Sequence, residues 1–73
     1  MIPRRIQNMV LKALGRPPEL LRVAVMPLWN DHFRVNVFTG SYSSGATIPN
    51  SFFVTADGDG KILHAVPAIL KQY

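Results

Sequence analysis

The chain has 73 residues, of which 48% are apolar, 16% are charged and none is cysteine. This length allows a single domain, which buries only about 60% of the surface that its unfolded chain exposes. The lack of cysteine excludes disulfides and thiolate metal sites, and leaves two histidines and four carboxylates as the strong metal ligands. A second copy of the chain is therefore the expected source of additional stability.

The net charge of +4 comes entirely from the first third of the chain, where five basic residues stand against Glu19. A one-sided basic distribution suggests an anionic partner, although charge this modest also serves plain solubility. No apolar run approaches the roughly 20 residues that span a bilayer, and Lys12 and Gly15 interrupt the one candidate for a signal-peptide core. The sequence therefore predicts a cytoplasmic protein without a membrane segment.

Apolar residues recur at helical spacing from Ile2 to Leu14, and basic residues occupy the opposite arc. This pattern predicts an amphipathic helix over about residues 2–15, which Gly15 and the two prolines after Arg16 bring to an end. The basic arc is most simply a solvated face, and it is also a candidate anion-contact surface. The candidate anion-contact residues are Arg4, Arg5 and Lys12 in the helix and Arg16 just beyond it.

Four segments alternate apolar and polar residues with a period of two, which is typical of half-buried strands. They cover about residues 20–26, 32–39, 51–56 and 61–66. The second, with Phe33, Val35 and Val37 on one face, is expected at the centre of the sheet. Residues 27–31 would connect the first two strands, and Trp29 is expected to cap the edge of the core, with an exposed contact role as the alternative.

Residues 40–50 read as a long polar loop because they are rich in glycine and serine. The tail, residues 68–73, is compatible with a helical turn or a frayed end. Residues 57–60, Asp-Gly-Asp-Gly, predict a hairpin turn. The short turns make neighbouring strands antiparallel, so the expected fold is α+β, with the helix on one face of a four-stranded antiparallel meander.

The Asp-Gly-Asp-Gly segment also resembles the middle of a calcium-binding EF-hand loop. Thr55 and Val66 would then occupy the first and last ligand positions, where carboxylates are required, so a turn is the better interpretation. Asp31 and His32 are adjacent and serines are plentiful, but no spacing typical of a nucleophile, a paired-carboxylate site or a metal site occurs. From the sequence we expect a protein that is not an enzyme and that has no cofactor, no metal and no small-molecule substrate. His32 and His64 are expected to be partly buried residues of the strands.

The second face of the sheet is the most informative feature. If the helix covers one side, the other is too apolar for a contiguous patch in water. Its expected residues are Leu20, Arg22, Met26, Arg34, Asn36, Phe38, Phe53 and Leu63, while Leu21 is placed in the core with the alternate valines and phenylalanines. Arg22, Arg34, Phe38 and Phe53 are the candidate interaction residues.

Three explanations for this face compete. The first is a homodimer formed by two such faces or by two edge strands, which makes the protein a non-enzymatic interaction or assembly module. The second is nucleic acid, with aromatic side chains stacking on bases, arginines meeting phosphates and the basic helix extending the surface. In the third, the 40–50 loop and the tail fold over the face; the covering residues would be Tyr42, Ile48, Ile69, Leu70 and Tyr73. The first explanation is preferred on the sequence alone.

Overall fold

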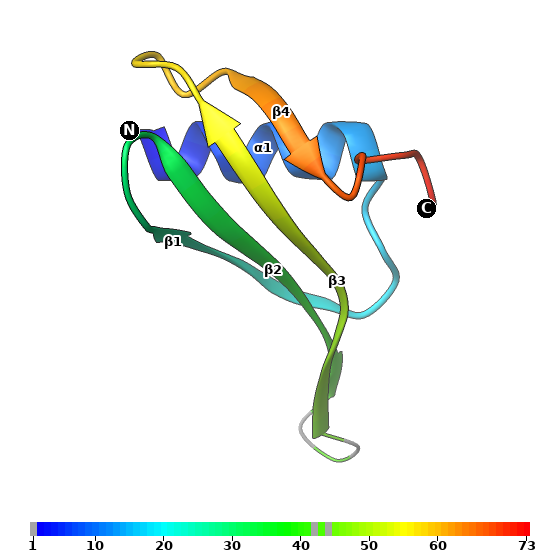
Figure 1. Cartoon of the computed structure of the whole chain (residues 1–73). Helices are drawn as coiled ribbons and strands as arrows, with labels where there is room; N and C mark the ends of the chain where they lie inside the picture. Colours follow the sequence, from blue (N-terminus) through cyan, green and yellow to red (C-terminus); the bar gives the residue numbers. More distant parts are fainter. Residues whose placement is uncertain (1, 42, 44) are drawn as a thin grey trace.

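The computed structural model describes residues 2–41, 43 and 45–73, and these residues form one helix followed by four strands (Figure 1). The elements are α1 (Ile2–Leu14), β1 (Leu20–Pro27), β2 (His32–Ser41), β3 (Gly45–Ala56) and β4 (Ile62–Val66). The strands form an antiparallel sheet in the order β1-β2-β3-β4. The predicted α+β class, with an N-terminal helix and a four-stranded antiparallel meander, is confirmed.

The helix faces the sheet with a narrow apolar stripe. Ile6, Val10 and Leu14 follow one another at four-residue spacing, so they share one side of α1, and each is at most 1% exposed. The helix stops at Leu14 because Gly15 takes a φ of 90°. The carbonyl of Leu14 accepts hydrogen bonds from the backbone N–H groups of Gln72 and Tyr73. The tail is therefore neither a helical turn nor a frayed end, because it caps the last turn of α1.

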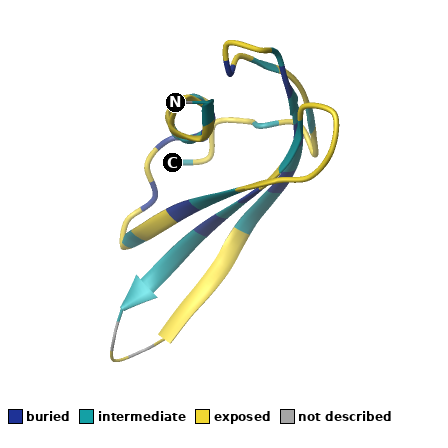
Figure 2. Ribbon diagram, turned by 90° about the vertical axis from the view of Figure 1, so that its left-hand side faces the viewer, coloured by how far each residue is buried: buried dark blue, intermediate teal, exposed yellow. Residues whose placement is uncertain are grey.

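The sheet meets this stripe with every second residue of its strands. Val35, Val37 and Val54 are fully buried on the side of the sheet that faces α1. Figure 2 shows the helix end-on, lying on this side of the sheet. Because strand residues alternate between the two faces, this side is the core and the opposite side is left uncovered by the helix. The residues of the buried hydrophobic core are Ile6, Val10, Leu14, Val23, Val35, Val37, Phe52, Val54 and Ala56.

Two β-bulges change the side of the sheet on which leucine side chains lie. In β1 the register shifts between Leu20 and Arg22, so Leu20 packs against the core and Leu21 is 45% exposed, the reverse of the prediction. In β4 the register shifts around Leu63, which lies beside a hollow next to α1 and not on the second face. Strict alternation fails at these positions because a bulge adds one residue to one strand only.

The predicted 40–50 loop is wrong: β2 and β3 continue past the core as a two-stranded arm (Figures 1 and 2). Gly40 pairs with Ala46, and Ser41 pairs with Gly45. Gly40 has a φ of 132°, and a side chain at this position would collide with the Gly45 carbonyl oxygen. Pro49 lies in a further irregularity of the β2–β3 register, where a missing N–H is tolerated. The arm is polar because it has no core to face, which gives it the composition of a loop.

The third explanation for the second face is also wrong. Ile48 projects from the arm with 49% exposure, and Leu70 is 73% exposed. Ile69 and Tyr73 pack against the core, and Tyr73 does so at the end of α1. Tyr42 lies outside the described residues. The segments proposed as a cover therefore lie elsewhere.

The buried helical stripe should dominate stability, which a pair of matched isoleucine substitutions can measure. We expect Ile6→Ala to lower the free energy of unfolding by about 2–5 kcal/mol, because it leaves a cavity between helix and sheet. Ile48→Ala removes the same atoms from the exposed arm and should change stability by no more than about 0.5 kcal/mol. Urea denaturation of both variants makes the comparison, and equal losses would contradict this assignment of the core.

Candidate functional site

The outer face is the side of the sheet opposite α1. Residues paired directly across antiparallel strands point to the same side, so the register identifies its members. They are Arg22, Ala24, Met26, His32, Arg34, Asn36, Phe38, Ser51, Phe53, Thr55, His64 and Val66. The four interaction residues predicted from the sequence all belong to this set, whereas Leu20 and Leu63 do not. No acidic residue is among these members of the outer face.

The first pair of predicted residues joins β1 to β2. Arg22 lies directly opposite Phe38, and its guanidinium carbon is 4.8 Å from the centre of the Phe38 ring. This is a cation–π contact, which holds the arginine over an aromatic ring without a carboxylate partner. The pair offers a planar cation and an aromatic side chain at one place on the outer face.

The second pair joins β2 to β3. Arg34 lies opposite Phe53, and one of its terminal nitrogens donates a hydrogen bond of 3.1 Å to the Ser51 hydroxyl. The Ser51 hydroxyl in turn donates to the side-chain carbonyl of Asn36 at 2.6 Å. This chain of bonds orients the guanidinium but uses one of its five N–H donors, so donors remain for an anion.

Trp29 and His32 join Phe53 at one corner of the outer face. The rings of Trp29 and His32 stack at 5.2 Å with an angle of 17°, and Phe53 lies 5.8 and 5.7 Å from them at a tilt. Trp29 is 58% exposed, so the expectation that it caps the core edge is wrong. We call these three residues the aromatic corner.

A tight turn creates the aromatic corner. Asn30 and Asp31 both have positive φ angles, 42° and 63°, as hairpin turns of the mirror-image type require, and the His32 N–H donates to the Trp29 carbonyl. The His32 Nδ1 lies 2.9 and 2.8 Å from the Trp29 and Asn30 carbonyl oxygens, so this nitrogen is the donor. The sequence signal was the Asn-Asp pair between Trp29 and His32, because such a turn brings its flanking residues together.

The four residues predicted as an anion-contact surface do not join the outer face. Arg4, Arg5 and Lys12 are exposed on α1, which lies on the other side of the sheet (Figure 2). Arg16, just beyond the helix, is also exposed. The idea that the basic helix extends the arginine and phenylalanine surface is therefore not supported, since the sheet separates the two.

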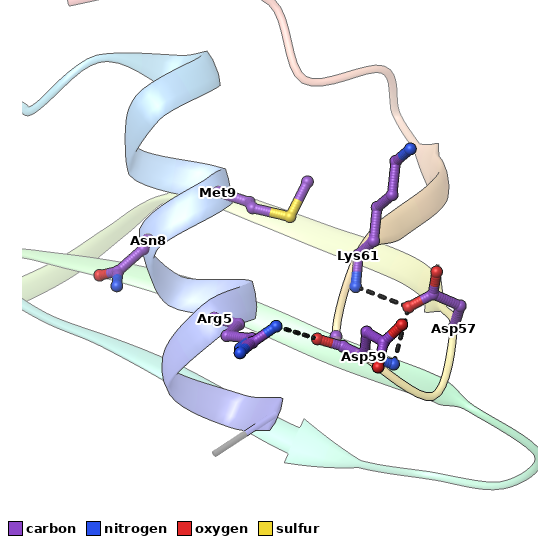
Figure 3. Close-up of a pocket in the computed structure, with 7 residues that line it drawn as sticks. Arg5, Asn8, Met9, Asp57, Asp59 and Lys61 are labelled. Atoms are coloured by element: carbon purple, nitrogen blue, oxygen red, sulfur yellow. Dashed lines mark hydrogen bonds between the residues drawn. The ribbon is translucent and has the colours of Figure 1, made fainter.

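A hollow of about 410 Å³ lies between α1 and the β3–β4 turn (Figure 3). The turn is the predicted hairpin: the Asp57 carboxylate accepts hydrogen bonds from the N–H groups of Asp59 and Lys61, each 2.9 Å long. Arg5 reaches across to the Asp59 carbonyl oxygen at 3.1 Å. The acidic and basic side chains around this hollow balance, and its polar bonds join helix to turn. We therefore treat it as a structural contact.

Comparisons of the chain with protein-family models, with curated proteins and with solved structures found no match. Within the described residues, no helix combines the length and the apolar character needed to cross a membrane. These residues also contain no group of three or more histidine and acidic side chains placed to hold a metal ion. Function is therefore inferred from the chemistry of the outer face.

The β3–β4 turn should show a defined pH dependence. The Lys61 N–H is the main cause that lowers the pKa of the Asp57 carboxyl from 3.8, and it outweighs an opposing effect of desolvation. Because the charged form is favoured in the folded state, its contribution to stability is present above the unfolded pKa and is lost as the pH falls through the folded pKa. We expect Asp57→Ala to lower the melting temperature at about pH 7, and the difference from the unmodified protein to shrink at about pH 2.

The matched control is Asp59→Ala, which removes the same charge from the same turn but leaves both bonds to Asp57. It should lower the melting temperature less than Asp57→Ala does at neutral pH. Calorimetric scans at the two pH values test this, and equal effects of both substitutions would show that charge alone, and not the turn bonds, is responsible.

Proposed function

We propose that the protein is a binding module that holds single-stranded nucleic acid on the outer face of its sheet. The observation that supports this proposal is the composition of the face: two arginines, each opposite a phenylalanine, with no acidic residue among them. Aromatic rings and guanidinium planes stack on bases, and guanidinium donors bind phosphate. Both kinds of group are presented side by side on an open surface.

The spacing of the two pairs suits an extended strand. Phe38 and Arg34 are four residues apart on β2, which corresponds to about 13 Å along the strand. A nucleic acid strand crossing the outer face would therefore meet one stacking position at Phe38 with Arg22 and a second at the aromatic corner with Arg34. In a duplex the bases already stack on one another and are not available to these rings, so the proposal predicts a preference for single strands.

The electrostatics of the outer face favour nucleic acid over face-to-face self-association. Two copies meeting through this face would bring Arg22 and Arg34 of one toward Arg22 and Arg34 of the other. Neither face supplies a carboxylate, and burying cations without a partner is costly. A nucleic acid strand supplies one phosphate per nucleotide. The homodimer through the outer face, which the sequence favoured, remains a prediction that the same set of variants can test.

Binding should be measured by fluorescence anisotropy with a labelled single strand and a labelled duplex of the same sequence. If Arg22 and Arg34 each neutralise one phosphate of a single strand, the affinity should fall about sevenfold between about 50 and 200 mM salt. The duplex should bind more weakly than the single strand. No binding of either probe at the lower salt concentration would exclude this function.

Matched substitutions locate the surface. Arg34→Ala should weaken binding and reduce the salt dependence, while Arg4→Ala, which removes the same charge from α1, should leave both nearly unchanged. Phe38→Ala should cost about 1–3 kcal/mol of binding free energy through lost stacking. The opposite result for the two arginines would place the anion site on the helix.

A further inference from the structure

The sheet is open, and its two edge strands differ in how well they are protected. The edge of β1 is partly covered, because the Gln7 side-chain amide of α1 donates a hydrogen bond of 2.8 Å to the Val23 carbonyl oxygen. β1 also contains Arg22, and charged side chains discourage edge pairing. β4 has no Lys, Arg, Asp or Glu along its five residues, and Leu63 and Val66 are 62% and 55% exposed. By charge, the edge of β4 is therefore the less protected of the two against pairing with another strand.

A hollow of about 440 Å³ runs along this edge between α1 and β4. Ala13 of α1, Ala65 of β4 and Ala68 of the tail line it, together with the larger Met9, Ile62 and Ile69. The bulge in β4 leaves Leu63 beside the same hollow. Within β4, the large exposed side chain of Leu63 is therefore followed two residues later by Ala65, whose small side chain leaves space in the hollow.

We propose that β4 pairs antiparallel with β4 of a second copy, about a two-fold axis at His64. In this register His64 lies opposite His64 of the second copy and Leu63 opposite Ala65, while Ile62 lies beyond the bulge, on the side that faces α1. A two-fold interface must be self-complementary, and here each Leu63 fills the space that Ala13, Ala65 and Ala68 leave in the other copy. The unpaired backbone groups of each β4 edge become hydrogen-bonded to one another.

The charges near β4 are compatible with this arrangement. Lys61 immediately precedes the strand, so the two copies of Lys61 stand at opposite ends of the interface. The core of each copy is small, with nine buried residues in its hydrophobic cluster among the described residues, so the added apolar burial should raise stability. The resulting eight-stranded sheet leaves both outer faces uncovered and on the same side. The inference does not depend on what those faces bind.

Light scattering on the full chain at micromolar concentration tests the proposal. The expected mass is twice the 8.1 kDa of one chain. Leu63→Lys should give a monomer with unchanged circular dichroism, because this side chain is mostly exposed. Leu21→Lys, the same substitution at a 45% exposed leucine of the other edge strand, should leave the dimer intact. Phe38→Glu on the outer face should also leave it intact.

A monomer of the unmodified protein at these concentrations, or a dimer that survives Leu63→Lys, would overturn the proposal. Dissociation by Leu21→Lys would show that the interface lies at the β1 edge, and dissociation by Phe38→Glu would show that it lies on the outer face. Either result rejects pairing through β4. Anisotropy measures nucleic acid binding and light scattering measures the mass of the assembly. Failure of nucleic acid binding and failure of the dimer are therefore distinguishable.

The register has its own test, which benefits from a chain without native cysteine. His64→Cys should form an intermolecular disulfide under mild oxidation, because residues opposite one another on the two-fold axis have Cβ atoms about 4.5–5.5 Å apart. Val66→Cys is the control: the two copies of residue 66 are about 13 Å apart along the strands in this register. Efficient crosslinking of Val66→Cys, or none of His64→Cys, would rule out the proposed pairing.

Discussion

The packing of the α1 stripe against one face of the sheet stabilises the fold and decides which surfaces stay exposed. Ile6, Val10 and Leu14 bury completely against alternate residues of the strands. One helix of 13 residues covers one side of the sheet, and the described residues form no second layer on the other side. The same packing that stabilises the fold therefore leaves an open face and two strand edges available for contacts with other molecules.

What occupies an exposed surface depends on its charge as much as on its apolar area. The outer face contains enough aromatic surface to suggest a protein interface, yet its formal charges at neutral pH are Arg22 and Arg34, with no carboxylate to neutralise them in a symmetric contact. This combination matches a polyanion that also carries flat apolar groups. The edge of β4 has the opposite character, since it is apolar and its side chains vary in size, which suits a copy of itself. The two surfaces meet at β4, because His64 and Val66 belong to both.

Small irregularities decide which side chains reach these surfaces. The bulge in β1 exposes Leu21 and returns Leu20 to the core, and the bulge in β4 moves Leu63 from the outer face to the edge. The tight turn at Asn30 and Asp31 places the Trp29 ring on His32. Each bulge shifts a side chain by a single residue position, and all three features alter the chemistry of a candidate binding surface.

The class of fold could be predicted from the sequence, because helical and strand periodicities are local and strong: the helix, four strands, their antiparallel order and the turn at residues 57–60 were all predicted. It also identified Arg22, Arg34, Phe38 and Phe53 as sharing a face, since no bulge separates them from the central alternation. Tertiary structure alone decided the bulges, the extension of β2 and β3 into an arm, the aromatic corner and the separation of the basic helix from the outer face. These depend on pairing register and on which element lies across which side, and neither is encoded in the period of a single segment.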